Sequence, residues 1–530
     1  MADPNSSAAQ SPTQSPLRLP LFRALWIATI VSNVGTWMHD AGAGWLMTSL
    51  SDAPIMVALV QAATTLPMFL FALPGGALAD IVDRRRLLIL AQFWALICAG
   101  LLALATFQGL TGPGLLLGLT FALATGAALS APAFQAIVPE LVPRQALPEA
   151  VSLNSLGINI SRAIGPALGG FIIAAAGPAA VFALNALSVL GVWLVLLAWK
   201  RQAKHNTLPA EHFTGALRAG ARYVRHSPAL RTVLVRSIGF FIFASALWAF
   251  VPIIARRELG LGAAEYGALL GSMGAGAIVG AVLLPHVRRF LSANGLTIAA
   301  TLLFACVSVG LAFAHGFAQA AACMAFAGMA WITMLSSFNV AAQTAAPSWV
   351  KARALAINLL VFQGSMAAGS AGWGWTAGHL GIPNTLLIAA SGMVLALGLA
   401  LRWKIKGDMA GNIAPSSHWP SPIVAVDSPT DRGPVMITVE YLIDPARKAG
   451  FAKAMGTLRR IRHRDGAISW ALYEDAAEPG RMVESFVLES WLEHLRQHER
   501  VTHADREDQE AVRGFHLGTE PPVVRHLIAP

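Results

Sequence analysis

The chain has 530 residues, of which 55% are hydrophobic and only 12% are charged, whereas roughly 25% are charged in an average soluble protein. So few charges exclude a water-exposed surface of ordinary size, and they place most of the chain in lipid. The formal net charge of +10 does not indicate nucleic-acid binding, because the basic residues lie in short clusters between apolar runs, as membrane topology places them.

The N-terminal segment 1–17 is predicted to be disordered, because Ser, Pro, Gln and Ala dominate it. It has no basic start followed by a short apolar run, so no cleavable signal peptide is expected. Three cysteines, Cys98, Cys306 and Cys323, are isolated in apolar stretches and give no disulfide framework.

Apolar runs of about 20 residues, the length that a bilayer core of about 30 Å requires, recur along most of the chain. They predict an all-α membrane body with twelve transmembrane helices, near 21–48, 54–79, 87–109, 114–138, 149–176, 179–200, 229–254, 263–285, 294–315, 317–345, 352–378 and 383–403. The twelve divide into two six-helix halves, 18–200 and 228–406, joined by a cytoplasmic loop at 201–227. A linker at 407–432 then leads to a charged, soluble domain at 433–530.

Lys and Arg in the short connections predict the orientation, because cytoplasmic loops are enriched in both. One side of the membrane receives chiefly Arg256 and Arg257. The other side receives Arg18, Arg23, Arg84, Arg85, Arg86, Arg144, Lys200, Arg201, Lys204, Arg218, Arg222, Arg225, Arg288, Arg289, Lys351, Arg353, Arg402, Lys404 and Lys406. This richer side is expected to be cytoplasmic. An even number of crossings then places both termini in the cytoplasm of a cell whose inner (cytoplasmic) membrane holds the chain.

The chain also matches itself at an offset of about 204 residues. The matching pairs are Gly76 and Gly280, Arg84 and Arg288, Arg85 and Arg289, Phe134 and Phe338, Pro143 and Pro347, Asn154 and Asn358, Gly165 and Gly369, and Gly177 and Gly381. Two parallel six-helix repeats enclosing a central site are typical of secondary transporters that work by alternating access. A channel or a receptor has no need of this duplication.

The connection between the second and third predicted helices carries a charged motif, Gly76-Ala-Leu-Ala-Asp80-Ile-Val-Asp83-Arg84-Arg85-Arg86. It resembles the loop signature of the major facilitator superfamily, with Asp83 where that superfamily usually has Gly. The resemblance implies a conformational switch, in which the carboxylate and the basic residues hold the two halves together in the outward-open state. A plain positive-inside anchor is the alternative for Arg86. The second copy has Leu284 where Asp80 stands, so the first half is expected to carry the full switch.

The fifth predicted helix contains Gly165-Pro166-Ala-Leu-Gly169-Gly170, which resembles an element that the superfamily associates with exporters and antiporters. Small residues let helix backbones approach closely, and ordinary packing is the alternative for each glycine taken singly. The order of residues in Ser32–His39 and Trp45–Thr48 narrows the resemblance to the transmembrane secretion effector branch, which contains enterobactin-type siderophore exporters.

Three ionisable residues fall inside predicted helices, where a charge costs about 3 kcal/mol or more unless it has a partner. Asp40 and His39 lie in the first helix, and Arg162 lies near the middle of the fifth. We hypothesise that Asp40 or His39 binds a coupling proton, and that Arg162 tunes it or meets an anionic substrate. The alternatives are a structural role for Arg162 at the Pro166 bend and a place for Asp40 near the outer interface.

Polar amides and one tryptophan in the predicted helices are candidates for orienting a substrate in a mostly aliphatic cavity. They are Trp37, Gln61, Gln135, Asn154, Asn159, Asn339, Asn358 and Gln363. Hydrogen bonds between helices are an equally good explanation for the amides.

The C-terminal domain shows a β-α-β-β-α-β order, with strands at 435–443, 468–474, 482–489 and 523–528 and helices at 445–463 and 491–515. That order is ferredoxin-like. It resembles the dimeric α+β barrel group that includes small antibiotic-biosynthesis monooxygenases. His494 and His498 lie one turn apart, with His503 following, but no third ligand stands at a firm metal spacing. We therefore expect no metal or cofactor, and a role in homodimerisation or regulation.

These patterns together predict a proton-coupled exporter of a small organic molecule such as a siderophore, a drug or a secondary metabolite. Its partners are then the substrate, the lipid bilayer and the proton, and the chain is not an enzyme. Three alternatives stay open: an importer of the same fold, a membrane-anchored oxidoreductase that acts through the C-terminal domain, and a sensor in which that domain signals the transport state.

Overall fold

The structure, a computed structural model, describes residues 15–199, 213–347, 349–405, 416, 419 and 432–529, except the side chains of 77, 80, 81, 144, 213–219 and 499. Most of the predicted disordered N-terminus and of the linker at 407–432 therefore lies outside the described residues. The chain forms two compact units. The first unit comprises Met1–Ala210, Arg236–Ser337 and Leu359–Arg402, and the second comprises Glu211–Val235, Phe338–Asn358 and Trp403–Pro530.

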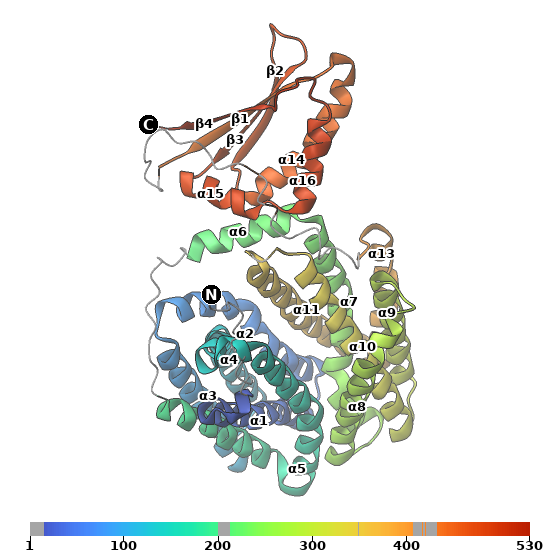
Figure 1. Ribbon diagram of the computed structural model, residues 1–530. Helices are drawn as coiled ribbons and strands as arrows, with labels where there is room; N and C mark the ends of the chain where they lie inside the picture. The colour runs from blue at the N-terminus through green and yellow to red at the C-terminus, as the bar shows by residue number, and fades with distance from the viewer. Residues whose placement is uncertain are drawn as a thin grey trace, which may run out of the picture. The chain divides into compact units, whose positions relative to one another are not determined.

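The first unit is a helical bundle (Figure 1). A short 3₁₀ turn (Pro16–Arg18) precedes its helices, which are α1 (Pro20–Leu50), α2 (Pro54–Ile81), α3 (Arg84–Phe107), α4 (Pro113–Leu141), α5 (Leu147–Ala198), α8 (Ala263–Val287), α9 (Ala293–Ala312), α12 (Ile382–Ala396), α13 (Gly398–Arg402) and most of α7 (Pro228–Ile253), α10 (Phe317–Thr344) and α11 (Lys351–Leu380). The remaining ends of these last three helices, 228–235, 338–344 and 351–358, belong to the second unit. Within the described chain, ten helices are long and apolar enough to cross a membrane. The protein is thus a mostly helical membrane protein. Helix α1 is not among the ten, because Ser, Asn, Thr, His and Asp interrupt its apolar sequence.

Helix α3 shows how these helices meet lipid. Its buried side consists of small and medium side chains such as Ala95, Ala99 and Leu102. Leu90, Leu101 and Leu104, on another side, expose half or more of their surface. A helix that is apolar on its exposed side as well as its buried side is stable in hydrocarbon and not in water.

The bounds of the helices repeat along the chain. Helices α4 and α10 begin at Pro113 and Phe317, and α5 and α11 begin at Leu147 and Lys351, so each pair is separated by 204 residues. Helix α5 has 52 residues, about 78 Å at 1.5 Å per residue, far more than a bilayer core requires. It breaks at Gly177, whose φ of 77° matches the φ of 77° at Gly381 between α11 and α12. Helix α5 is therefore two helical segments, the counterparts of α11 and α12.

The second unit contains a small antiparallel sheet. Its strands are β1 (Val435–Leu442), β2 (Ser469–Glu474), β3 (Arg481–Leu488) and β4 (Val523–Ile528), in the order β2-β3-β1-β4. Helices α14 (Lys448–Asp465), α15 (Trp491–Arg500) and α16 (His503–Arg513) cover one face of the sheet (Figure 1). Phe451, Met455 and Leu458 of α14 pack there against Ile437 and Phe486. This core follows from the alternating burial of β1 and β3.

Two details of the second unit differ from the sequence-based prediction. The single helix predicted at 491–515 is divided into α15 and α16, because Thr502 caps a new helix. The Thr502 hydroxyl accepts a hydrogen bond from the Asp505 backbone N–H at 3.3 Å, and the Asp505 carboxylate accepts one from the Thr502 N–H at 2.9 Å. The region predicted as a cytoplasmic loop at 201–227 contains a helix, α6 (Phe213–His226).

Candidate transport cavity and its conformational contacts

A cavity of about 900 Å³ lies within the first six-helix half, between α1, α2, α3, α4 and α5. Its side chains include aromatic rings, many uncharged polar groups and one carboxylate. The polar and aromatic lining residues are Phe22, Trp26, Thr29, Ser32, Asn33, Thr36, Asp40, Thr64, Gln92, Thr120, Ser130, Phe134, Gln135, Asn154 and Ser155. A volume of this size suits a small organic molecule.

Helix α1 contributes one continuous face to this cavity. Six of its lining residues are spaced alternately by four and three positions, which places them on one side of a helix; we call them the α1 stripe: Phe22, Trp26, Thr29, Asn33, Thr36 and Asp40. The stripe extends about 27 Å at 1.5 Å per residue, with Asp40 at one end. The sequence analysis identified only Asp40 among these six. The helical period of the stripe was the available signal.

The candidate cavity residues divide into two groups. Gln135 and Asn154 line the cavity. Asn159 instead donates to the Ser155 carbonyl at 3.0 Å. In the second unit, the Asn358 amide donates to Asn339 at 3.4 Å, which is the interhelical hydrogen bond considered as an alternative. The remaining candidates, Trp37, Gln61 and Gln363, are not among the described lining residues.

The three intramembrane ionisable residues lie in different surroundings. Asp40 faces the cavity, whereas His39 is buried and its ring lies 5.0 Å from that of Phe182. The guanidinium of Arg162 lies over the Trp37 ring, 5.5 Å from its centroid, and is not part of the cavity lining. Among the described contacts, no ion pair or hydrogen bond joins Arg162 to Asp40. The described contacts therefore include none through which Arg162 would tune the proton affinity of Asp40, as the sequence-based hypothesis expected.

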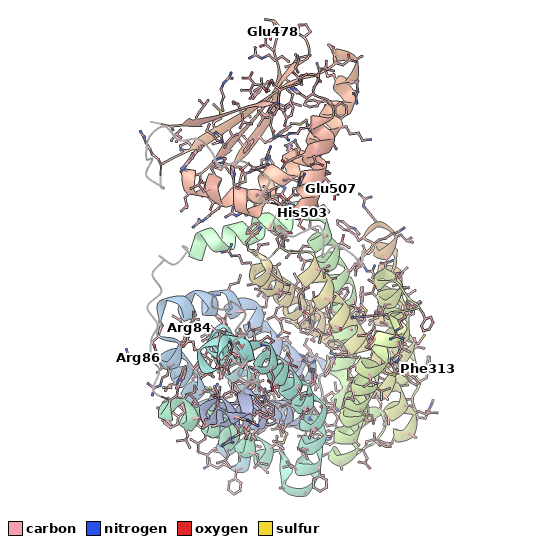
Figure 2. The ribbon with its side chains drawn as sticks, in the orientation of Figure 1. Arg84, Arg86, Phe313, Glu478, His503 and Glu507 are labelled. Carbon is pink, nitrogen blue, oxygen red and sulfur yellow. The ribbon has the colours of Figure 1, made fainter. Side chains whose placement is uncertain are left out.

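The charged motif at the start of α3 makes contacts within the first half. Asp83 caps α3, and its carboxylate accepts a hydrogen bond from the Arg86 N–H at 2.9 Å. Arg84 forms an ion pair with Glu140 of α4 at 3.0 Å. Arg84 and Arg86, labelled in Figure 2, belong to the first turn of this helix. We call this end of the bundle, where α2 ends and α3 begins, the Arg84 end.

The other residues of the charged motif do not take part in the Arg84–Glu140 ion pair. Arg85 donates to the carbonyl oxygens of Leu196 and Leu197, at 3.0 and 2.9 Å, and so ties α3 to the last turn of α5. The side chain of Asp80 lies outside the described residues. A Cβ at Gly76 would meet nothing within 4 Å, whereas one at Gly75 would lie 2.9 Å from the Leu129 Cα. The close approach of α2 to α4 therefore depends on Gly75 and not on Gly76.

Glu140 is the partner that the sequence analysis missed. It lies 56 positions from Arg84, so no local spacing connects the two residues. The available signal was that Glu140 is an acidic residue at the end of an apolar run, on the side of the membrane where the connections are otherwise rich in arginine.

The glycines of the α5 motif set its packing against two helices. A Cβ at Gly165 would lie 2.5 Å from the Trp37 Cβ, and one at Gly169 would lie 3.1 Å from the Met38 Cα, so both glycines bring α5 onto α1. A Cβ at Gly170 would lie 2.3 Å from the Cα of Gly267 in α8. Real Cβ atoms do not approach backbone this closely, so only glycine fits at Gly170.

The repeat gives Gly170 a counterpart at Gly374, 204 residues later. A Cβ at Gly374 in α11 would lie 3.0 Å from the Cα of Ile55 in α2. Helix α5 thus touches the second half at α8, and α11 touches the first half at α2. The two contacts are related by the internal repeat, and both lie toward the end of the bundle where α1 ends and α8 begins, which we call the Arg257 end.

Two arginines add polar contacts between the halves at the Arg257 end. Arg257 forms an ion pair with Asp52 at 3.0 Å and donates to the Thr48 and Ser51 carbonyl oxygens at 3.0 and 2.8 Å. Arg256 donates to the Thr48 hydroxyl at 3.1 Å. Arg256 and Arg257 lie in the π-helical turn Ile254–Glu258 that follows α7, and they join it to the last turn of α1 and the residues after it. The described structure is therefore held closed at the Arg257 end.

A model of the transmembrane secretion effector family matches residues 11–530, which includes both units. The chain belongs to this family. The resemblance of the membrane helices to the transmembrane secretion effector branch is thereby confirmed, and the protein is a multi-pass transporter of the major facilitator superfamily.

Similar members of known function are siderophore transporters. An enterobactin exporter, EntS, of Shigella boydii is 28% identical over 322 residues, which cover 60% of this chain and 75% of that protein. A staphyloferrin A transporter of Staphylococcus aureus is 22% identical over 298 residues, which cover 56% of this chain and 74% of that protein.

Solved structures share the fold of this secretion effector. A bacterial homologue of the human lysosomal transporter Spinster, in an inward-facing and unoccupied conformation, matches with a TM-score of 0.60 at 13% identity and covers 73% of this chain and 97% of that chain. A POT family transporter in complex with a thioalcohol-conjugated peptide also has a TM-score of 0.60 at 13% identity, covering 72% of this chain and 95% of that chain. Both matches establish the fold alone.

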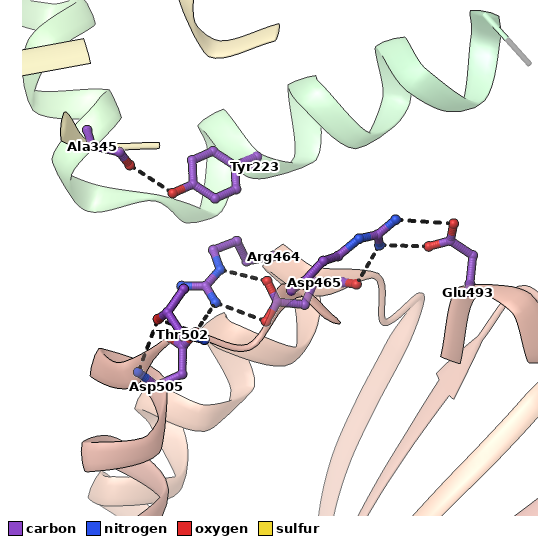
Figure 3. Close-up of polar contacts among 8 residues, drawn as sticks. Tyr223, Ala345, Arg464, Asp465, Glu493, Thr502 and Asp505 are labelled. Carbon is purple, nitrogen blue, oxygen red and sulfur yellow. Dashed lines mark hydrogen bonds and ion pairs between the residues drawn. The ribbon is translucent and has the colours of Figure 1, made fainter. Parts of the chain in front are cut away.

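In the second unit of this secretion effector, a buried polar network joins α14 and α16 (Figure 3). The Arg464 guanidinium is bidentate to Asp465, at 2.8 and 2.9 Å, and also contacts Asp505 at 2.6 Å. Burial would raise the pKa of Asp505, but Arg464 and Thr502 outweigh it and hold that pKa below its usual range. Two carboxylates that share one guanidinium are thus kept in a dry site.

The network continues to α6 and to the residues between α10 and α11. Arg464 lies 6.0 Å from the centroid of the Tyr223 ring, and the Tyr223 hydroxyl donates to the Ala345 carbonyl at 2.8 Å. Burial raises the pKa of Tyr223 to about 12, so it stays neutral and remains a donor. Arg500 pairs with Glu493 at 2.8 Å and lies 4.6 Å from the centroid of the Trp349 ring. The C-terminal domain, α6 and the adjoining ends of α7, α10 and α11 form one body.

The histidines of α15 lie close together. The Nε2 atoms of His494 and His498 lie 3.3 Å apart, and the ring centroid of His526 lies 4.7 Å from that of His494. His503 begins α16 (Figure 2). Within the described residues, no three His, Cys, Asp or Glu side chains are placed to hold a metal ion.

His494 makes the stability of the C-terminal domain depend on pH. Burial, with the charges of His498 and His526, lowers its pKa to about 3, from an ordinary value near 6.5. Because the unfolded chain binds this proton more readily, stability falls as pH falls from 6.5 towards 3. We expect a loss of about 2 kcal/mol between pH 6.5 and pH 5, measured by hydrogen exchange of tail peptides in the full-length protein. His494→Leu should flatten this dependence, and an unchanged slope in that variant would count against it.

Proposed function

We propose that this chain exports a small organic molecule in exchange for protons, by alternating access of the cavity in its first half. The α1 stripe is the observation that supports this proposal. It lines a chamber of suitable volume over most of the length of a membrane crossing, and it ends at the carboxylate of Asp40. The enterobactin exporter supports the outward direction, and together with the staphyloferrin A transporter it supports a siderophore or a related metabolite as the substrate. An importer of the same fold is the remaining alternative within transport.

We infer twelve crossings in two six-helix halves, with α1 and the two segments of α5 each crossing once. The arginines of the Arg84 end favour a cytoplasmic location for that end and for both termini, in a cell inner membrane. The Arg257 end then faces outward. Its glycine contacts and the Arg257–Asp52 pair support an inward-facing state, like that of the Spinster homologue.

We propose that Asp83, Arg84, Arg85 and Arg86, together with Asp80 and Gly76 of the same motif, form the conformational switch, and that Glu140 belongs to it. The Arg84–Glu140 pair holds the start of α3 against the end of α4. In the outward-open state, contacts between the Arg84 end and the second half replace the Arg84–Glu140 ion pair. Of the motif that also contains Pro166, Gly165 and Gly169 pack α5 against α1 within the first half, and Gly170 provides the close contact with α8 about which the halves tilt.

Asp40 is the proposed proton site, in preference to His39. Asp40 faces the chamber through which substrate and protons arrive, whereas His39 packs against Phe182. Arg162 is assigned a packing role over Trp37.

A second function for the C-terminal domain is regulation of transport. The supporting observation is the buried network that ties it to α6 and to helix ends of the second half. Its strand order fits the ferredoxin-like class, and we assign it no catalysis. Deleting the residues after Arg432 should change the efflux rate, and an unchanged rate would remove this role.

The uncovered face of the sheet supports a homodimer. Leu442, Tyr473 and Leu527 lie on the face opposite α14 and expose about half of their side chains. Two such faces packed together bury these three side chains, next to the ion pairs that Glu440 forms with Arg481 and Arg525 on the same face. A one-protomer mass for the solubilised chain in light scattering would contradict the dimer.

Metabolite profiling inside and outside cells tests the transport proposal. Cells with the protein should lower the internal level of one compound and raise its external level, and a protonophore should abolish the difference. Profiles that do not change with the protein contradict export. Accumulation inside the cell supports the importer instead.

A further inference from the structure

The charge of the transported molecule can be inferred from the cavity lining, and this step rests on the proposed transport function. Among the described lining residues, Asp40 is the one ionisable side chain. The other polar groups are hydroxyls and amides, as at Thr36, Asn33 and Gln135. No Lys, Arg or His of the described chain lines this chamber.

We infer that the substrate is an organic cation and not an organic anion. An anion in this chamber would lose its hydration and would meet a carboxylate without a compensating cation. Arg162, the residue expected to meet an anion, is directed instead to the Trp37 ring. The chamber thus lacks the guanidinium or ammonium groups by which proteins bind carboxylates and phosphates.

The remaining lining supports an amphipathic cation. Phe22, Trp26 and Phe134 provide aromatic surface in the same chamber, and aromatic faces attract cations as well as apolar groups. The α1 stripe leads from these rings past hydroxyl and amide groups to Asp40. A cationic centre held at Asp40 and an apolar body near Trp26 satisfy both ends of the chamber.

The same geometry makes proton and substrate compete. One carboxylate balances one positive charge, so a proton on Asp40 removes the attraction for a cation, and a bound cation disfavours the proton. Competition at a single group couples the export of a cation to the entry of a proton without a second site.

Binding of two ions of matched size and opposite charge tests this inference. The probes are radiolabelled tetraphenylphosphonium and tetraphenylborate, measured by equilibrium dialysis with the full-length protein in detergent at pH 7.5. We expect the phosphonium ion to bind at least tenfold more tightly than the borate. Asp40→Asn should weaken phosphonium binding at least tenfold and leave borate binding equal or stronger.

A relocated carboxylate separates charge recognition from a structural role. Asn33→Asp, in the Asp40→Asn chain, places a carboxylate seven positions earlier on the same stripe and should restore at least part of the phosphonium affinity. Borate binding as tight as phosphonium binding, binding of neither ion, or no effect of Asp40→Asn overturns the inference. Metabolite profiles that still show export of an anion would then keep the transport proposal while rejecting the charge class.

Discussion

Replacing Gly170 by valine is expected to reduce transport by roughly 5- to 150-fold. Any Cβ at this position would lie 2.3 Å from the Gly267 Cα and 2.6 Å from the Gly267 N, so α5 and α8 must separate to admit a side chain. Overpacking of this kind costs about 1–3 kcal/mol. Because a free-energy change of 1.4 kcal/mol changes an equilibrium constant tenfold, the population of the state closed at the Arg257 end falls correspondingly.

The matched control for this change lies in the same helix. A Cβ at Gly191 would meet nothing within 4 Å, so Gly191→Val adds the same β-branched residue to α5 without a clash. Efflux of the compound identified by profiling, divided by the amount of protein in the membrane, is the quantity to compare. Equal rates for Gly170→Val and Gly191→Val would show that this contact does not limit the transport cycle.

Features that depend on local sequence were predictable. The apolar runs and the repeat gave helices near their observed bounds, because the length of a membrane helix is set by the continuous run of apolar residues. The break at Gly177 was also predictable, since Gly177-Pro178 follows an apolar run and the glycine recurs as Gly381, with a proline two positions after it. The four strands of the tail occur within about a residue of their predicted ends, because alternating apolar residues specify them.

Features that depend on which side of a helix meets which neighbour were not predictable from local patterns. Arg162 and Asp40 both fall within membrane helices, but their partners are set by helix rotation, which turned one toward Trp37 and the other toward the cavity. Glu140 is remote from Arg84 in sequence. The division of the last tail helix depended on a cap at Thr502, which a helical pattern across 491–515 concealed. Tertiary packing decided all of these.

Replacing Arg464 by methionine is expected to destabilise the C-terminal domain by about 3–5 kcal/mol, because it leaves two buried carboxylates without their guanidinium. Asp465 and Asp505 are only 1% and 2% exposed, so water cannot take the place of Arg464. The loss should appear at pH 7 as faster hydrogen exchange in α14 and α16. It should extend to α6, because Arg464 also lies against Tyr223.

Two further variants separate the charge effect from the loss of side-chain volume. Asp505→Asn in the Arg464→Met chain removes one of the stranded charges, while the Asn amide oxygen can still accept the hydrogen bond from the Thr502 N–H, so it should recover part of the stability. Arg506→Met breaks an exposed pair with Glu510 and should cost under about 1 kcal/mol. If Arg464→Met costs no more than Arg506→Met, the network does not hold the domain and α6 together, and a regulatory coupling through it loses its physical basis.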